Sequence, residues 1–374
     1  MIDVKAFKEI NKIIERDATS STYKFILLKN TIEICQKFEH LIKISDKLVY
    51  LPLGLLVEGW IFDYLPFVFK RISQQPKHKV LNTPIENEYE NLFKSMNLDR
   101  NKTIWQDAYI NIYNAYHNLE FNKKQVFIFG NLARLTAKTI VNMPMRYIGS
   151  MPYTIFIPEK KSFGRGSFSN VKIIHRGILI SGFGYFGLPK EYYYVFRYFG
   201  QSLYGTSTII RRWKEKTYKY NKKNIIKDEI DSMILKSEVR EVESVKKLLF
   251  ANIDIQCVWS GEILKNRKYD IDHILPFSIW QNNDFWNLLP SSPKINNKKR
   301  DKIPPPQLIK KRAEAILYYW QIYEKQIPEV FWYQIKTSLV GNSKISISLN
   351  DCIDALCMKA DYLIRDRGFD IFDF

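Results

Sequence analysis

The residues of this chain that could do chemistry together are concentrated between positions 269 and 301. An acid stands directly before a histidine in Asp272-His273, and two asparagines and a run of cations follow, at Asn287 and over 296–301. Hydrolysis of a phosphodiester needs a base that activates water, an oxygen-ligated divalent cation at the phosphate, and positive charge that holds the strand. The residue types of this segment could supply all three.

The same segment predicts the elements that would hold these side chains. Along a strand, Asp270 and Asp272 would point to one face and His273 to the other, so a strand end or a bulge is needed to bring Asp272 and His273 to one site. Pro276 cannot continue a central strand, and a loop is therefore expected to begin there.

A second strand and a helix are expected next. Residues 285–289 are predicted as a short strand that carries Asn287. Ser292 suits a helix cap and Pro293 suits the first turn, so a helix should follow. Three of its residues are expected on neighbouring faces, namely Asn296, Lys299 and Arg300. Strand, loop, strand and helix in this order make a ββα-metal unit.

This segment resembles the HNH endonuclease family, and most closely the HNH domains of type II CRISPR-associated RNA-guided nucleases. In those domains the order is Cys-x-x-Ser-Gly, Asp-x-Asp-His-x-x-Pro, Asn, and Asn-x-x-Lys-x-Asp. The matching residues lie within 250–305 and are Cys257-Val-Trp-Ser260-Gly261, Asp270-Ile-Asp272-His273-Ile-Leu-Pro276, Asn287 and Asn296-Asn-Lys-Lys299-Arg-Asp301.

The resemblance implies roles for four residues. His273 would be the general base, Asp272 and Asn296 would ligate the metal, and Asn287 would orient the His273 ring by holding its other nitrogen. It implies Mg²⁺ as the cofactor, for which Mn²⁺ can substitute. The alternative without a function is that a helix cap, a surface Asp and a core His match the order of the motif by chance. A degenerate, inactive HNH fold is a further alternative.

The cysteines argue against the structural zinc that many HNH domains hold with two Cys-x-x-Cys pairs. Here the first pair is Cys257 and Ser260, and no pair follows the motif. Zinc needs four good ligands, so no zinc is predicted. The other cysteines, Cys35, Cys352 and Cys357, are interpreted as small buried hydrophobes.

Length and composition indicate a multi-domain protein of the cytoplasm. The chain has 374 residues, of which 46% are hydrophobic, and about two to three domains are expected at this length. The start of the sequence lacks the charged and then apolar pattern of a signal peptide. The most hydrophobic window, 48–69, contains Glu58 and Asp63, so a buried pair of helices is expected there and a membrane span is not. Four cysteines without a pairing pattern suit a reducing compartment.

Positive charge gathers in two clusters, which predicts a nucleic-acid groove. The net charge is +18. The first cluster lies in 209–227, and its predicted phosphate contacts are Arg211, Arg212, Lys214, Lys219, Lys222 and Lys223. The second cluster lies in 294–312, and its predicted contacts are Lys298, Lys299 and Arg300. Either cluster alone could be a solvated helix face, whereas two clusters with one inside the motif favour DNA binding. Trp213, Tyr218 and Tyr220 could stack on bases or form the apolar side of a helix.

The chain as a whole is expected to have an α+β fold. It is predicted as a mainly helical, multi-region protein with a small β-hairpin element and a ββα-metal HNH nuclease domain near the C-terminus. The hairpin is expected at 171–180, with His175-Arg-Gly177 as its turn. Four regions are predicted: a helical and mixed region for substrate or partner recognition at 1–205, a basic helical arm at 206–244, the nuclease domain at 245–306, and a helical region at 307–374.

Together these features predict a Mg²⁺-dependent HNH endonuclease that hydrolyses DNA by nicking or by double-strand cleavage. Restriction or anti-phage defence is the expected setting, with a partner defence protein or a second protomer as further partners and no membrane. An RNA-guided role is disfavoured, because no second, RNase H-like nuclease domain is found. The alternatives are a nucleic-acid-binding module with an inert HNH fold and an RNA-cutting toxin.

Overall fold

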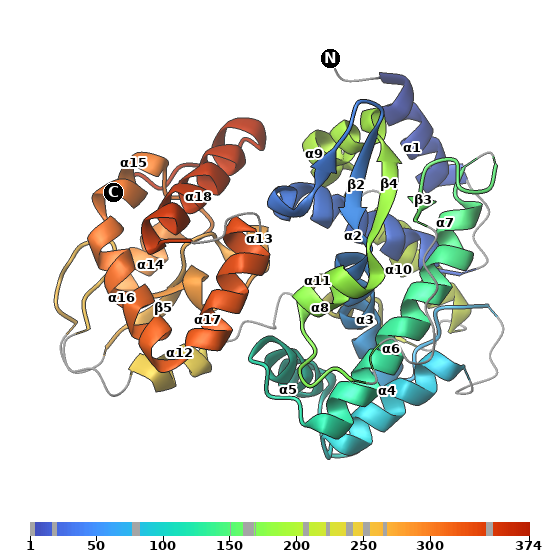
Figure 1. Cartoon of the computed structure of the whole chain (residues 1–374), viewed down its shortest axis with the longest axis horizontal. Helices are drawn as coiled ribbons and strands as arrows, with labels where there is room; N and C mark the ends of the chain where they lie inside the picture. Colours follow the sequence, from blue (N-terminus) through green and yellow to red (C-terminus); the bar gives the residue numbers. More distant parts are fainter. Residues whose placement is uncertain are drawn as a thin grey trace. The chain divides into compact units, whose positions relative to one another are not determined.

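A computed structural model gives the fold of the protein. It describes residues 4–16, 21–76, 83–149, 151–159, 168, 170–204, 209–221, 225–236, 242–249, 255–264, 268–341 and 347–374. Helices dominate and the strands are short and antiparallel, so the expected class, α+β and mainly helical, is confirmed (Figure 1). The chain divides into two compact units, Met1–Val239 and Arg240–Phe374, each with a hydrophobic core of its own.

The first unit is a helical body with one small sheet. Its elements are α1 (Val4–Arg16), α2 (Tyr23–Lys37), the 3₁₀ turn η1 (Glu39–Leu41), β1 (Lys43–Ile44), β2 (Leu48–Pro52), α3 (Leu53–Phe69), α4 (Pro84–Ser95), α5 (Trp105–His117), α6 (Lys123–Asn142), α7 (Pro144–Tyr147), β3 (Ile157–Pro158), α8 (Arg176–Phe183), β4 (Tyr185–Pro189), α9 (Lys190–Tyr204), α10 (Ile209–Tyr220) and α11 (Lys227–Leu235). The strand order is β1-β2-β4-β3, with every pairing antiparallel.

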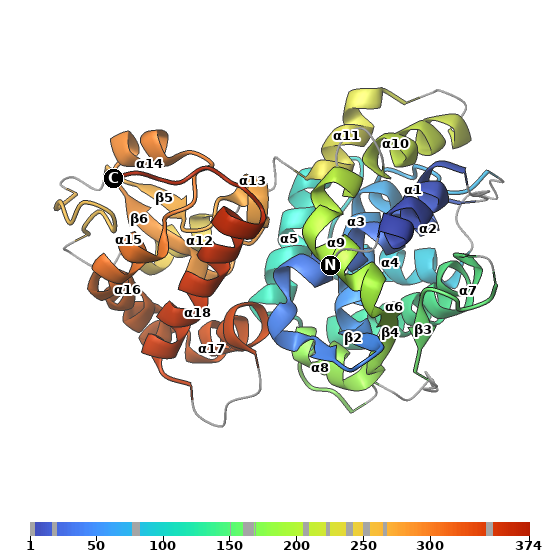
Figure 2. The same cartoon turned by 90° about the horizontal axis from the view of Figure 1, so that it is seen from above.

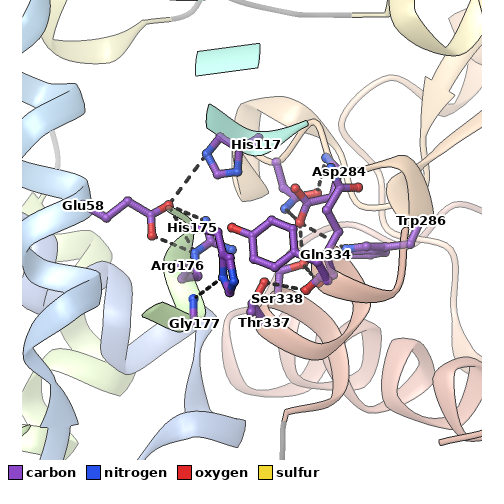
Figure 3. A network of polar contacts seen from close by, with 12 residues as sticks. Glu58, His117, His175, Arg176, Gly177, Asp284, Trp286, Gln334, Thr337 and Ser338 are labelled. Atoms are coloured by element: carbon purple, nitrogen blue, oxygen red, sulfur yellow. Dashed lines mark hydrogen bonds and ion pairs between the residues drawn. The ribbon is translucent and has the colours of Figure 1, made fainter. Parts of the chain in front are cut away.

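Helix α3 is the centre of this unit and packs on α2, α5, α6 and α8. The window 48–69 was expected to be a pair of helices, and this was wrong. Its first five residues form β2, which pairs with β4, and a single helix follows. Gly54 allows α8 to lie close, because a Cβ at this position would come within 2.3 Å of the Leu179 carbonyl carbon. A buried ion pair between Glu58 and Arg176 also joins α3 to α8, with Arg176 Nη2 2.8 Å from Glu58 Oε1 (Figure 3).

The hairpin expected at 171–180 was also wrong. His175 is the N-cap residue of helix α8, and its Nδ1 accepts a hydrogen bond from the Gly177 backbone N–H at 3.1 Å. The β-branched residues around it had favoured strands, but Leu179 and Phe183 are buried on one side of a helix instead. A strand pair joined by a short turn does occur in this unit, between β1 and β2.

Helices α10 and α11, which fall in the predicted arm of 206–244, contribute to the core of the first unit. Trp213 is fully buried, and its indole N–H donates to Gln74 Oε1 at 2.9 Å. Thr217 donates to the same amide oxygen at 3.2 Å. Trp213 therefore faces the core, which favours the apolar-side interpretation over base stacking for this residue.

The second unit contains the predicted nuclease domain and the helices that follow it. Its elements are α12 (Glu243–Leu249), β5 (Asp270–His273), α13 (Phe277–Trp280), the 3₁₀ turn η3 (Phe285–Asn287), β6 (Leu288–Ser291), α14 (Pro293–Lys299), α15 (Pro306–Lys311), α16 (Ala313–Gln326), α17 (Pro328–Gln334), the π-helical turn η4 (Ile335–Val340), α18 (Leu349–Asp361) and the π-helical turn η5 (Tyr362–Asp366). Figure 2 shows α14 beside β5.

One hydrophobic core extends through this unit from Val245 to Phe372, so the nuclease segment and the C-terminal helices are packed together. Trp320 of α16 illustrates the connection, because its indole N–H donates to the Trp286 carbonyl at 2.9 Å. None of the helices in the described parts of either unit combines the length and the apolar content that crossing a membrane requires.

Candidate active site

The candidate site is built on the β5–β6 strand pair and helix α14. The two strands pair antiparallel without a bulge, with Asp272 opposite Leu289 and His273 opposite Leu288. Ser292 caps α14 as expected, because its Oγ accepts from the Ile295 backbone N–H at 3.4 Å and Pro293 occupies the first turn. The second strand begins after Asn287, since residues 285–287 form a 3₁₀ turn.

Asp272 lies in a buried ion pair with Lys299 of α14. Lys299 Nζ is 3.0 Å from Asp272 Oδ1 and donates to the His273 carbonyl at 2.6 Å. The Trp259 indole N–H donates to Asp272 Oδ2 at 2.7 Å. The Lys299 side chain is 0% exposed and that of Asp272 is 5% exposed. Burial raises the pKa of Asp272 and lowers that of Lys299, because desolvation disfavours both charged forms.

His273 ends β5 and is held on the side of the loop that follows. Its Nε2 lies 2.9 Å from Asn283 Oδ1, and its ring centroid is 5.3 Å from that of Phe277. If the Asn283 amide oxygen accepts this hydrogen bond, the proton is on Nε2. In that tautomer of the uncharged ring, the lone pair is on Nδ1.

Asn287 contacts the loop backbone. Its Oδ1 accepts from the Leu275 backbone N–H at 2.8 Å, and its Nδ2 donates to the carbonyls of Leu275 and Asn282, both at 3.1 Å. Its side chain is completely buried. From the sequence, Asn287 was predicted to hold the His273 ring. In the structure the side chain next to His273 Nε2 is that of Asn283. Asn283 is thus a site residue that the sequence reasoning missed, since no motif position marks it.

The side chains near β5 offer oxygen atoms, the donor type that a hard divalent cation prefers, although both oxygens of Asp272 are hydrogen-bonded within the protein. Asn296 Nδ2 donates to Asp270 Oδ2 at 3.0 Å, which leaves the amide oxygen of Asn296 as a potential ligand. The sequence predicted Asp272 and Asn296 as metal ligands, and this hydrogen bond brings the carboxylate of Asp270 next to Asn296 as well. Mg²⁺ takes one or two carboxylates from a protein and keeps several waters. The described residues contain no group of three or more His, Cys, Asp or Glu that could hold a metal, so an amide oxygen would have to complete the set.

Comparison with known families agrees with this arrangement. Residues 257–305 match the family model described as HNH endonuclease, and residues 3–234 match the model described as domain of unknown function (DUF8808). The second match spans more than half of the chain. The chain belongs to the DUF8808 family. It also carries an HNH endonuclease domain, as the sequence predicted. No curated protein and no solved structure matches the chain.

The three cations predicted on the helix of the HNH domain have different environments. Lys298 and Arg300 are exposed, and the ammonium of Lys298 lies 5.8 Å from the centroid of the Phe374 ring. Lys299 is buried against Asp272, so its charge acts inside the site. The prediction that Arg300 lies on the helix was wrong, because α14 ends at Lys299 and Arg300 is its C-cap residue with φ 51°.

The basic arm of the DUF8808 region is partly neutralised by acids. Arg211 lies 3.5 Å from Glu215, and Lys214 forms an ion pair with Asp231 of α11. Lys219 is exposed and Arg212 is half-buried. Lys222 and Lys223, also predicted to bind nucleic acid, lie outside the described residues.

The four cysteines are buried and unbridged. Cys257 stands at the start of the HNH segment, and its Sγ is 3.7 Å from Ser291 Oγ of β6. Cys257, which corresponds to the first cysteine of the zinc-binding pattern, therefore packs against the hydroxyl of Ser291.

Proposed function

We propose that the protein is a Mg²⁺-dependent endonuclease that hydrolyses DNA phosphodiester bonds at its HNH domain. One observation carries the proposal: within the segment that matches the HNH family, the adjacent Asp272 and His273 stand at the end of β5, and Asn296 faces the same strand from α14. The residue types are those of a metal-assisted hydrolase, and they are on neighbouring elements of one compact unit.

In this proposal His273 is the general base. Its Nδ1 takes a proton from water, the water oxygen attacks the phosphorus, and the bond to the 3′ oxygen breaks. The 3′ oxygen leaves as an alkoxide that takes a proton from solvent water, so the products are a 5′ phosphate and a 3′ hydroxyl. Asn283 keeps the ring in the required tautomer. Asp272 and Asn296 would hold a Mg²⁺ or Mn²⁺ ion, which would stabilise negative charge on the phosphate as a Lewis acid.

Lys299 has a separate task in the proposed site. Its ammonium donates to both the Asp272 carboxylate and the His273 carbonyl, so it fixes the strand end on which the two residues stand. Lys298 is exposed on the same helix, Arg300 is exposed at its C-terminal cap, and both would neutralise phosphates of the bound strand.

The cellular role is proposed as restriction or anti-phage defence in the cytoplasm. A single HNH centre cuts one strand, so a double-strand break would need a second protomer or a second event. The DUF8808 region would then select the DNA or receive a partner defence protein. Arg211 and Lys219 of α10, both exposed, are the candidates for a DNA contact there.

A second candidate function is nucleic-acid binding by an inert HNH fold. The observation that favours it is the closed state of Asp272, which is 5% exposed with both carboxylate oxygens hydrogen-bonded, to Lys299 and Trp259. An acid that stays in this pair cannot ligate a metal freely.

One experiment separates the candidates. Supercoiled plasmid DNA and a labelled RNA are offered together to the protein with Mg²⁺, with Mn²⁺, or with EDTA. The proposal expects cleavage of DNA with either metal and none with EDTA. Binding without any cleavage would support the inert fold, and cleavage of the RNA alone would support the toxin. Asp272→Ala and Asn296→Ala are expected to raise the metal concentration needed or to abolish cleavage.

A further inference from the structure

Residues 281–284, between α13 and η3, form a tight turn that carries Asn283, the asparagine that holds His273. Gln281 adopts a left-handed conformation with φ 46° and ends α13. Asn282 Oδ1 then accepts from the Asp284 backbone N–H at 3.0 Å, which closes a local Asx turn. Asn283 is the residue between these two partners, so the position of its side chain depends on how firmly the turn is held.

The carboxylate of Asp284 is the centre of this turn. Its Oδ2 accepts from Asn282 Nδ2 at 2.7 Å, from the Trp286 indole N–H at 3.3 Å, and from the Ser338 hydroxyl. Asp284 is 2% exposed. Figure 3 shows Asp284, Trp286, Gln334 and Ser338 gathered in this network. A buried carboxylate with several donors is rigid, because a lost donor leaves charge unpaired in the interior.

Two of the groups that hold the turn come from the C-terminal helices. Ser338 stands on the π-helical turn Ile335–Val340 and accepts from the Trp286 indole N–H at 2.7 Å, and its hydroxyl also lies 2.8 Å from the Gln334 carbonyl oxygen. Gln334 precedes that turn, and its Oε1 accepts from the Phe285 backbone N–H at 2.8 Å. Both side chains are buried. They lie beyond residue 305, where the match to the HNH family ends.

We propose that Asp284 and Ser338 are positioning residues for His273. Ser338 fixes the Asp284 carboxylate, Asp284 fixes the turn, and the turn presents Asn283 Oδ1 to Nε2 of His273. The π-helical turn matters because the extra residue it inserts changes which side chains of the helix face the site. The inference deepens the proposed function and rests on it: the C-terminal helices would be part of the catalytic apparatus.

The test uses the full-length protein, plasmid DNA and saturating Mg²⁺. Asn283→Ala is expected to lower kcat by about 10- to 100-fold with little change in KM, as for other residues that orient a catalytic group. Ser338→Ala is expected to lower kcat by about 10-fold on the same ground. Ser338→Thr retains a hydroxyl and should restore most of the rate.

Thr337→Val is the matched control. It removes a buried hydroxyl from the same π-helical turn, but one that donates to the Tyr333 carbonyl of its own helix at 2.9 Å. Its kcat should stay at the wild-type value. Thermal unfolding of every variant shows whether a loss of rate is merely a loss of folded protein.

The double variant decides the route of action. If Ser338 acts through Asn283, then Ser338→Ala adds little to the defect of Asn283→Ala, and the double variant is within about twofold of the Asn283 single variant. If the two defects multiply, Ser338 acts elsewhere and the proposal is overturned. The proposal is also overturned by a folded Ser338→Ala protein with wild-type kcat.

A readout without catalysis separates this inference from the proposed function. The chain has five histidines, so long-range ¹H–¹⁵N spectra of histidine-labelled protein can report the His273 tautomer, assigned with His273→Ala. We expect the Nε2–H form in the wild type and a mixture in Asn283→Ala and Ser338→Ala. A wild type that cuts nothing but shows this pattern would end the proposed function and leave the positioning intact. An unchanged tautomer in both variants would overturn the positioning.

Discussion

His273 is the residue on which the proposed chemistry depends most directly. Its Nε2 is held by Asn283, and the general-base task falls to Nδ1. His273→Ala should lower cleavage by at least about 100-fold, since general bases contribute about 10²- to 10⁴-fold. DNA binding and thermal stability should remain close to wild type. The measurement is the rate of plasmid nicking at saturating Mg²⁺, together with a binding titration. A variant that keeps more than about a tenth of the rate would falsify the assignment.

Asn287 makes a contrasting prediction, because its contacts are structural. Asn287→Ala would leave the Leu275 N–H and two carbonyls without their buried partner. Each unsatisfied buried group costs about 1–3 kcal/mol, so these three groups predict a loss of at least about 3 kcal/mol in the free energy of unfolding. Urea unfolding measures it, and Asn297→Ala, at an exposed position of α14, is the control. A stable Asn287→Ala protein with only a rate defect would instead return Asn287 to a role at the His273 ring.

The sequence predicted the polar residues of the site better than their partners. Asp272, His273 and Asn296 follow one another in a recognisable order inside the segment that matches the HNH family, and their roles stay a prediction. Asn283 and Asp284 could not be identified from the sequence. The turn that positions them is held by Gln334 and Ser338, which lie about fifty positions further along the chain. Such long-range contacts leave no local pattern.

Among the helices and strands, those with local signals were predicted well. Ser292 and Pro293 start α14 as their types suggest, and Ser292 makes the expected cap. The helix α8 was missed, because its β-branched residues favour strands while its helical state depends on packing against α3 near Gly54. The β6 strand was placed three residues early for a similar reason, since η3 is held by tertiary hydrogen bonds.

Helix α14 and its C-cap residue Arg300 allow a test of which neighbouring cations contact phosphate. Lys298 and Arg300 are exposed, whereas Lys299 is buried against Asp272. Each true phosphate contact contributes a slope of about −0.9 to log affinity against log salt on duplex DNA. Replacing Lys298 and Arg300 by Gln together should therefore flatten that slope by about 1.8. Binding titrations at several salt concentrations measure it.

The control for this helix is Arg365→Gln, which removes an exposed cation of the same unit that is paired with Asp361. It should leave the slope nearly unchanged. If the double variant of α14 also leaves it unchanged, the groove lies elsewhere. Arg211→Gln with Lys219→Gln on α10 then becomes the next pair to examine, because both side chains are exposed on the DUF8808 region.

The molecule as a whole has two hydrophobic cores with no residue in common, one extending from Ala6 to Ile234 and the other from Val245 to Phe372. Composition predicted more than one core, since 46% hydrophobic residues in 374 positions can fill two. It could not predict that the C-terminal helices share the core of the HNH domain. That sharing depends on which faces of α16 and α18 meet the nuclease strands, and helical periodicity gives the face but not its partner.

Because the chain has two separate hydrophobic cores, we expect a substitution in one core to destabilise only the unit that contains it. Leu28→Ala in the first core and Leu356→Ala in the second each remove a fully buried side chain, at a cost of about 2–5 kcal/mol. By calorimetry each variant should lower one transition by roughly 5–15 °C and leave the other in place. The two variants should differ in activity after mild heating, because only Leu356→Ala weakens the core that carries His273. If both variants shift one common transition by the same amount, the chain unfolds as a single cooperative body, and the positions of the site residues depend on the DUF8808 region as well.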